Sequence, residues 1–209
     1  MNRALTREEG KLITRRRLVE AATRLLGKQG PAGLSASAVA RAAGIAQPTF
    51  YVHFKDKDEL LRTIAAEKIG GLRKALREAR ERVRSGEGVD AIRETFRLPM
   101  QTFVVAAPEL FRLYMRELHH PSSPLGEHAR RLFDELRGDL VEDLERIGMP
   151  AGTPSEKERL DMIAEAMIAQ TQALGIAYLE GRYSNLDDVV EILTRFAVGV
   201  MTLGEASAT

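Results

Sequence analysis

The side chains best suited to chemistry lie close together in residues 47–57. Within seven residues an amide, a hydroxyl, a phenol and an imidazole occur at Gln47, Thr49, Tyr51 and His53, and Lys57 follows. Groups of this kind form hydrogen bonds with base edges and phosphates when a helix presents them to the major groove. The segment therefore predicts a surface that contacts double-stranded DNA.

Two short helices separated by a sharp turn are needed to present these groups. Ser35 suits the N-cap of the first helix, because its hydroxyl can accept a hydrogen bond from a free backbone amide. Gly44 can adopt the left-handed backbone that such a turn requires. In the second helix Phe50 and Phe54 stand four residues apart and therefore share one face. We predict a helix-turn-helix whose buried face comes from Val39, Ala43, Ile45, Phe50 and Phe54.

An ordinary helical hairpin packed in a core is the alternative interpretation of this segment. It does not account for polar tips beside two lysines, nor for the uneven distribution of charge along the chain. Residues 1–84 contain 19 Lys and Arg against 9 Asp and Glu, whereas the remainder contains 12 against 21. A basic head attracts phosphates and an acidic body stays off the duplex, which favours DNA binding.

The same residues resemble the DNA-binding domain of the TetR family of bacterial transcriptional regulators. The resemblance is carried by SASAVA at 35–40, AGI at 43–45, PTFY at 48–51, HF at 53–54 and KDEL at 57–60. In that family the residues matching Thr49, Tyr51 and Lys57 contact the DNA backbone. Two positions depart from the pattern: Ala46 stands where a capping Ser or Thr is common, and Pro48 where Gly is frequent. Proline is tolerated in a first helical turn, so the departures affect base contacts and not the fold.

A preceding helix completes the predicted head. Thr6 and Glu9 have the spacing of a capping box, so this helix is expected to run from there to about Lys28. Its three consecutive arginines, at 15–17, are candidates for phosphate contacts that position the protein without reading sequence. The candidate DNA-binding residues are Arg16, Arg17, Ser35, Ser37, Gln47, Pro48, Thr49, Tyr51, His53 and Lys57.

Composition indicates a cytoplasmic globular protein. The chain has 209 residues, of which 44% are apolar and 29% charged, and it contains no cysteine. The absence of cysteine excludes disulfides and thiolate metal sites and suits a reducing compartment. The first residues lack the apolar core of a signal peptide, and no apolar run approaches the ~18 residues of a membrane span. We therefore expect no membrane partner.

The rest of the chain is expected to form a helical body. Asp56 and Glu59 can cap a helix of about 25 residues that links the head to the body. Pro99 is expected to kink a later helix. The last two helices, near residues 154–180 and 185–203, are apolar on more than one side, which predicts a homodimer through a four-helix interface. The prediction is an all-α protein of about nine helices, with a helix-turn-helix DNA-binding domain at residues 1–57 and a ligand-binding and dimerisation domain at residues 58–209.

Bulky and flexible side chains are concentrated in this body. Taken singly, each is expected to be core, but aromatic and methionine side chains also line pockets. TetR-type proteins bury a ligand pocket in the body, so the resemblance implies a hydrophobic small-molecule effector. The candidate ligand-binding residues are Phe96, Met100, Phe103, Phe111, Tyr114, Met115, Met167 and Thr171.

A narrower likeness suggests the class of this effector. TRRRLVEAA, AGIAQPTFYVHF, LRKALREARERV and LFRLYMREL are similar to segments of the TetR-type repressors of unsaturated fatty-acid synthesis. This likeness implies an acyl thioester. Arg112 and Arg116 are candidates for contact with its charged head group, and a solvated helix face explains these two arginines equally well. The residues do not distinguish an effector that releases DNA from one that promotes binding.

Other chemistry is weakly supported. Glu117 and His120 have the Glu-x-x-His spacing of di-metal helical bundles, but that site needs a second motif and two further carboxylates. A histidine pair favoured by the helix dipole is the simpler interpretation. No phosphate loop, nucleophile elbow or zinc-protease signature occurs, so we expect no enzyme, metal or cofactor. The alternative function is a helical ligand carrier or interaction protein without DNA binding, against which the basic head, Tyr51 and Lys57 argue.

Overall fold

Helix-start signals in the sequence agree with the observed helix ends. In the computed structural model, which describes residues 6–86, 88–120 and 122–206, α1 (Arg7–Gln29) begins with a capping box. The Glu9 amide donates to Thr6 Oγ1 at 3.2 Å, and the Thr6 amide donates to Glu9 Oε2 at 2.7 Å. Thr153 and Glu156 form the same pair at the start of α8. At α4 the expected box is incomplete, because Glu59 accepts from the amide of Lys55 and not from that of Asp56.

The described residues form nine α-helices and no strand, which confirms the prediction of an all-α fold. After α1 come a short 3-10 turn, η1 (Pro31–Gly33), and then α2 (Ala36–Ala42) and α3 (Gln47–His53). The remaining elements are α4 (Lys57–Arg84), α5 (Gly88–Pro99), a π-helical segment η2 (Met100–Val105), α6 (Pro108–Leu118), α7 (Pro124–Arg146), α8 (Pro154–Leu179) and α9 (Leu186–Ala206). Within this part of the chain, no helix is both long enough and apolar enough to cross a bilayer.

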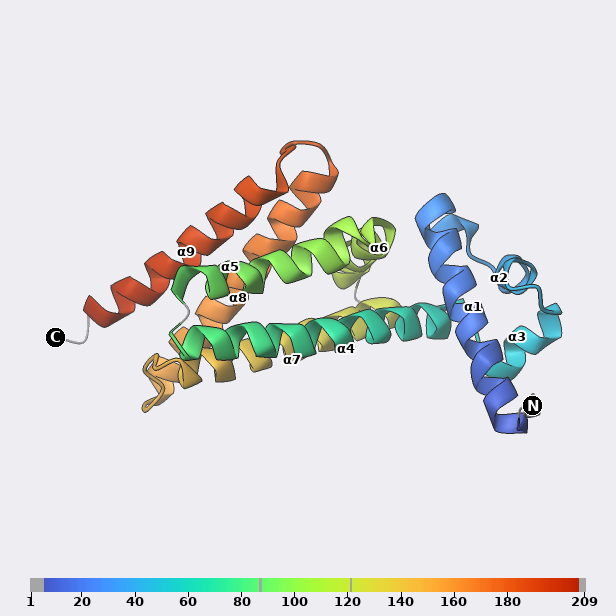
Figure 1. Ribbon diagram of the computed structural model, residues 1–209, viewed down its shortest axis with the longest axis horizontal. Coiled ribbons are helices and arrows are strands. Elements are labelled where there is room, and N and C mark those ends of the chain that lie inside the picture. Colours follow the sequence, from blue (N-terminus) through green and yellow to red (C-terminus); the bar gives the residue numbers. More distant parts are fainter. Residues whose placement is uncertain (1–5, 87, 121, 207–209) are drawn as a thin grey trace, which may run out of the picture.

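Helices α1 to α3 lie together at one end of the molecule, and α4 extends from them along the body beside α7 (Figure 1). Helix α4 has 28 residues, slightly more than expected. The core does not stop where the head meets the body. Phe50 of α3 and Ile64 of α4 belong to the same buried cluster as Ile69, Leu110 and Tyr114. Movements of the body can therefore reach α3 through packed side chains.

Pro99 changes the helix type where a kink was expected. Proline has no amide hydrogen, so the carbonyl of Thr95 loses its usual helical donor. Helix α5 ends at Pro99, and the six residues of η2 follow with wider turns. The amide of Ala106 donates to the carbonyl of Gln101 at 3.0 Å, a bond between residues five apart. Side chains after Pro99 are thereby rotated relative to those of a regular helix.

Helix α8 approaches this segment closely through Gly175. A Cβ atom at this position would lie 2.9 Å from Val104 Cγ2 and 3.0 Å from Phe111 Cζ. Glycine thus lets α8 pack directly on η2 and α6. Three alanines recur at every fourth position of α8: Ala177 is buried, whereas Ala169 and Ala173 are exposed.

Candidate DNA-binding surface and internal cavity

The turn between α2 and α3 is closed by backbone hydrogen bonds around Gly44. Gly44 has φ 66°, in the left-handed region. Its amide donates to Arg41 O at 3.0 Å, and the amide of Ile45 donates to Ala40 O at 2.9 Å. These bonds satisfy the last carbonyls of α2 and fix the direction in which α3 leaves the turn. The predicted helix-turn-helix is confirmed.

Helix α3 is anchored by the two phenylalanines expected to share a face. Phe50 and Phe54 are 0% and 1% exposed, with ring centroids 5.8 Å apart. The guanidinium of Arg15 lies 4.5 Å from the centroid of the Phe54 ring, and its Nη2 donates to Thr63 Oγ1 at 3.3 Å. Arg15 therefore packs against the buried side of the α3 end, at Phe54.

The opposite face of α3 is open to solvent. Gln47, Pro48 and Tyr51 are exposed, and Lys57 is exposed at the start of α4. Thr49 is half-buried. Gln47, Pro48, Tyr51 and Lys57 are thus open to solvent at the end of the molecule that holds α1 to α3 (Figure 1).

Val52 was not foreseen as part of this surface. Its side chain is 68% exposed and lies beside Tyr51. Helical spacing from Phe50 and Phe54 places Val52 off the buried face, and this signal could have identified it. An exposed apolar side chain here is suited to contact with a thymine methyl group.

His53 is less free than the sequence suggested. The residue is half-buried, and its Nδ1 atom is buried without a hydrogen-bond partner. Burial lowers the pKa of His53, and the positive charges of Lys11 and Arg15 lower it further. The imidazole is therefore neutral at pH 7.

The two serines of the α2 start are joined to each other. The amide of Ala38 donates to Ser35 Oγ at 3.1 Å, which confirms Ser35 as the N-cap. Ser35 Oγ and Ser37 Oγ are 3.1 Å apart, and both residues are exposed. Their hydroxyls remain accessible beside the turn.

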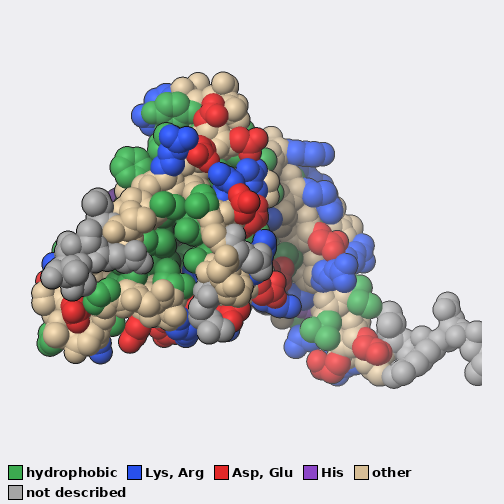
Figure 2. Space-filling model, turned by 60° about the vertical axis from the view of Figure 1, so that its left-hand side comes forward, with side chains coloured by type: hydrophobic (Ala, Val, Ile, Leu, Met, Phe, Trp, Pro, Cys, Tyr) green, Lys and Arg blue, Asp and Glu red, His purple; other side chains and the backbone are tan. Residues whose placement is uncertain are grey.

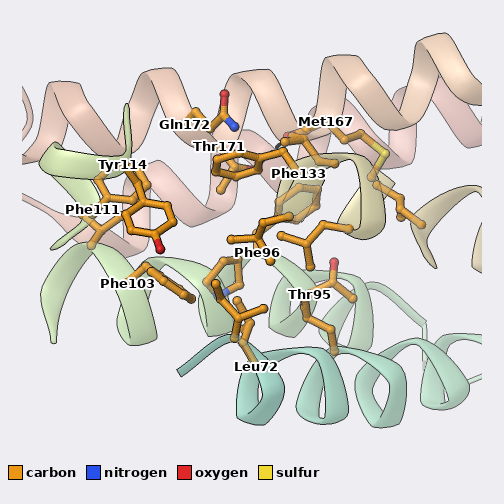
Figure 3. A pocket seen from close by; sticks show the side chains of 18 of the residues that line it. Leu72, Thr95, Phe96, Phe103, Phe111, Tyr114, Phe133, Met167, Thr171 and Gln172 are labelled. Atoms are coloured by element: carbon orange, nitrogen blue, oxygen red, sulfur yellow. Dashed lines mark hydrogen bonds between the residues drawn. The ribbon is translucent and has the colours of Figure 1, made fainter. Parts of the chain in front are cut away.

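An internal cavity of about 120 Å³ lies among α4 to α8. Its wall is mostly aliphatic and aromatic, and Figure 3 shows side chains from these helices facing a common space. In the face turned forward in Figure 2, apolar side chains fill a depression in the middle of the body. A cavity needs only about 10–15 Å³ to hold one water molecule, so this space accommodates a larger molecule.

Polar groups on the cavity wall are few. The hydroxyls of Thr95 and Thr171 donate to backbone carbonyls of their own helices, at 2.7 and 2.8 Å. The Tyr114 hydroxyl is buried without a hydrogen-bond partner, and burial raises the pKa of this phenol. Arg80 carries the only charge among the described residues that line the cavity.

A family comparison agrees with the helix-turn-helix geometry. Residues 18–64 match the model of the N-terminal domain of bacterial regulatory proteins of the tetR family. Residues 18–64 therefore form a TetR-type DNA-binding domain. The matched residues include the turn at Gly44, the exposed face of α3 and the first turns of α4. The chain is accordingly a transcription regulator with a helix-turn-helix DNA-binding domain.

Solved TetR-type structures extend the likeness to the body. A transcriptional regulator from Rhodococcus sp. RHA1 is 22% identical with a TM-score of 0.67, over 91% of this chain and 96% of that one. A putative TetR-family regulator from Syntrophomonas wolfei is 17% identical, with a TM-score of 0.69 and the same coverage. The repressor FadR of Thermus thermophilus, solved in complex with lauroyl-CoA, is 24% identical with a TM-score of 0.60, over 88% of this chain and 93% of that one. These likenesses show that the head and the body of this chain together share the fold of these regulators.

The wall of the cavity includes seven of the eight residues predicted to bind a ligand. They are Phe96, Phe103, Phe111, Tyr114, Met115, Met167 and Thr171. Met100 does not line the cavity: it is 0% exposed and belongs to a buried cluster with residues of α8 and α9. Sequence reasoning missed the α4 side chains Leu72, Leu76 and Arg80, and also Phe133 and Gln172.

The two arginines expected at a ligand head group lie elsewhere. Arg112 donates to Glu109 Oε1 at 2.7 Å and to the carbonyl of Leu179 at 2.9 Å, so it joins α6 to the end of α8. Arg116 pairs with Glu117 at 2.9 Å. Neither residue lines the cavity.

The Glu-x-x-His spacing does not assemble a metal site in the described part of the chain. No group of three or more potential ligands occurs there. Hydrogen bonding from Ser123, followed by that from Arg116, lowers the pKa of Glu117. The carboxylate of Glu117, near the end of α6, thus accepts a hydrogen bond from Ser123, the N-cap residue of α7.

Proposed function

We propose that this protein is a repressor that binds an approximately palindromic operator as a homodimer and changes its DNA affinity when a hydrophobic molecule fills the cavity. The observation that carries this proposal is the shared core. Ile69, Tyr114 and Leu132 line the cavity and belong to the same buried cluster as Phe50, the anchor of α3. A molecule that displaces the cavity wall therefore acts on side chains packed against the DNA-reading unit.

The DNA contacts divide by chemistry. Tyr51, Lys57 and Arg16 are assigned to phosphates, with the hydroxyls of Ser35, Ser37 and Thr49. Gln47 and His53 are assigned to base edges, with Pro48 and Val52 in apolar contact. Arg17 has a smaller role, because its guanidinium already donates to the carbonyl of Ala43 at 2.7 Å.

A homodimer through α8 and α9 is supported by exposed apolar side chains on both helices. Met162 is 59% exposed, Phe196 58% and Ile192 46%. Ala169 and Ala173, also exposed on α8, allow close approach of a second helix. Large apolar side chains on adjoining helices mark an interaction surface, and a symmetric copy covers both at once. Residues 58–209 then serve dimerisation and ligand binding, and residues 1–57 serve DNA binding in the cytoplasm.

The effector class follows from the cavity wall. Its aromatic, leucine and methionine side chains suit a hydrocarbon chain of adaptable shape. The fold neighbour from Thermus thermophilus holds lauroyl-CoA, which makes an acyl thioester a first candidate. Such a molecule regulates only to the extent that it prefers the arrangement of the dimer that cannot span both half-sites.

Selection of DNA fragments from a random pool by the purified protein tests the DNA-binding part of this proposal. We expect an enriched palindrome whose half-site spacing reflects the dimer. Gln47→Ala should change the selected bases and cost about 1–3 kcal/mol of binding free energy at the original site. Selection of the same palindrome by the variant would remove Gln47 from the base-reading residues, and no enrichment by the wild type would contradict operator recognition.

A further inference from the structure

The cavity ends at a fixed positive charge, the guanidinium of Arg80 on α4. The Arg80 side chain is 11% exposed. It stands where the main cavity meets a smaller one of about 30 Å³, and Thr95, Leu140 and Met167 also belong to both walls. The guanidinium therefore places a positively charged group at this end of a hydrocarbon-lined space.

Hydrogen bonding leaves Arg80 incompletely satisfied. Its Nη1 atom forms an ion pair with Asp143 of α7, whereas its Nε atom is buried without a hydrogen-bond partner. A buried donor without a partner is unfavourable, and more so when it belongs to a charged group. A further acceptor at this point would therefore be bound favourably.

Asp143 does not depend on Arg80 for its counter-charge. Arg146 Nη1 donates to Asp143 Oδ1 at 2.6 Å, and Arg146 Nη2 donates to Glu142 Oε2 at 2.8 Å. When Arg80 turns toward another anion, Asp143 therefore keeps a cationic partner. The exchange avoids leaving an unpaired buried charge, which is the costly outcome when an ion pair is broken.

The distance along α4 suits a chain that starts at Arg80. Ile69, Leu72, Leu76 and Arg80 all line the cavity. At ~1.5 Å per residue, the rise from Ile69 to Arg80 is roughly 16 Å, which is comparable to an extended medium-chain fatty acid. The Tyr114 hydroxyl is buried without a hydrogen-bond partner, and burial raises the pKa of this phenol, so it brings no negative charge into the cavity.

We infer that the cavity selects an amphiphile with a free carboxylate, which accepts hydrogen bonds from Nε and a terminal nitrogen of Arg80 while its hydrocarbon chain lies along α4. A carboxylate matches the guanidinium fork with two parallel hydrogen bonds, whereas a thioester carbonyl carries no charge. The inference rests on the proposal that the cavity binds a hydrophobic effector and narrows that effector to a carboxylic acid.

Isothermal titration calorimetry of the delipidated full chain with dodecanoate, methyl dodecanoate and dodecanoyl-CoA tests the inference. The acid and its methyl ester share one chain and differ in charge. We expect dodecanoate to bind at least about ten-fold more tightly than the ester and the thioester, as a charge-assisted pair predicts. Equal binding of acid and ester, or tightest binding of the thioester, would overturn the carboxylate assignment and leave the hydrophobic effector in place. Binding of none of the three would overturn both.

Two variants tie the preference to Arg80. Arg80→Gln should reduce the preference for the acid to within about two-fold, with ester binding unchanged. The double variant Arg80→Gln/Asp143→Asn removes both charges of the pair and should show the same loss without an unpaired aspartate. Arg73→Gln is the matched control, because Arg73 also joins α4 to α7, through Asp139 at 2.7 Å, but does not line the cavity. The Arg73→Gln variant should prefer the acid over the ester as strongly as the wild type does. If the double variant kept this preference, the role of Arg80 would be refuted.

Discussion

The guanidinium of Arg17 donates a hydrogen bond of 2.7 Å to the carbonyl oxygen of Ala43, the C-cap residue of α2. The preceding arginine has a different environment. The Arg16 side chain is 83% exposed and pairs with Glu20 of the same helix at 2.9 Å. Adjacent arginines of α1 therefore differ: Arg17 is hydrogen-bonded to the turn before α3, whereas Arg16 is open to solvent, where we propose that it contacts a phosphate.

Replacement of each arginine by alanine tests this difference. Arg17→Ala should lower the free energy of unfolding by about 1 kcal/mol, because a carbonyl at the turn loses its charged donor. Arg16→Ala removes only an exposed ion pair and should change stability by less than about 0.5 kcal/mol while weakening DNA binding. Urea denaturation of the two variants measures the difference, and equal losses of stability would contradict the stabilising role of Arg17.

Lys57 is expected to act on DNA through charge alone. The residue is exposed at the first position of α4. Lys57→Ala should weaken binding to specific and random duplexes alike and reduce the slope of log affinity against log salt by about 0.9, the value for one phosphate contact. Tyr51→Ala should also weaken binding to specific and random duplexes alike, but it should leave this slope unchanged because the phenol carries no charge. Fluorescence anisotropy at several salt concentrations gives both slopes, and an unaltered slope for Lys57→Ala would exclude the phosphate contact.

Stability should fall as the pH drops below about 6.5, the ordinary pKa of histidine. The pKa values of His53 and His128 are both lowered in the folded protein, in each case first by burial and then by neighbouring positive charge. Below about 6.5 the unfolded chain binds protons that the folded chain does not, so protonation favours unfolding. The stability contributed by the neutral imidazoles is complete above that pH and is lost as the pH falls toward the folded pKa values.

Urea denaturation at pH 7.5 and 5.5 measures this effect. The wild type should lose more stability between the two conditions than the variant His53→Gln/His128→Gln, because glutamine does not titrate in this range. If the variant lost more stability than the wild type between pH 7.5 and 5.5, the two histidines would not destabilise the folded protein at low pH, contrary to this prediction.

Local signals made the head predictable from the sequence. A cap at Ser35, a left-handed glycine at 44 and paired phenylalanines each act within a few residues, and all occur where they were expected. The incomplete box at α4 differs only in which backbone amide Glu59 accepts from. Nearest-neighbour interactions thus determine both the helix ends and the exposed face of α3.

The cavity was harder to predict because it depends on long-range geometry. In a regular helix Phe96, Met100 and Phe103 would share one face, yet Phe96 and Phe103 line the cavity whereas Met100, the first residue of the π-helical segment, is buried in the core beside it. The ion pair of Arg80 joins residues 63 positions apart, so its place at the cavity had no local signal. Arg112 and Arg116 do not line the cavity, and helical spacing alone does not reveal which face of a helix meets it.

The close approach of α8 to η2 and α6 predicts opposite effects for two Gly→Ala substitutions. At Gly175 a Cβ would lie 2.9 Å from Val104 Cγ2, so Gly175→Ala should destabilise the protein by about 1–3 kcal/mol through overpacking beside the cavity. Gly138 lies inside α7 with no atom within 4 Å of an added Cβ, and Gly138→Ala should stabilise it by about 0.5–1 kcal/mol. Thermal unfolding followed by circular dichroism compares the two variants. Tolerance of Gly175→Ala would contradict the close packing of α8 on η2 and α6, and destabilisation by Gly138→Ala would contradict the open surroundings of Gly138.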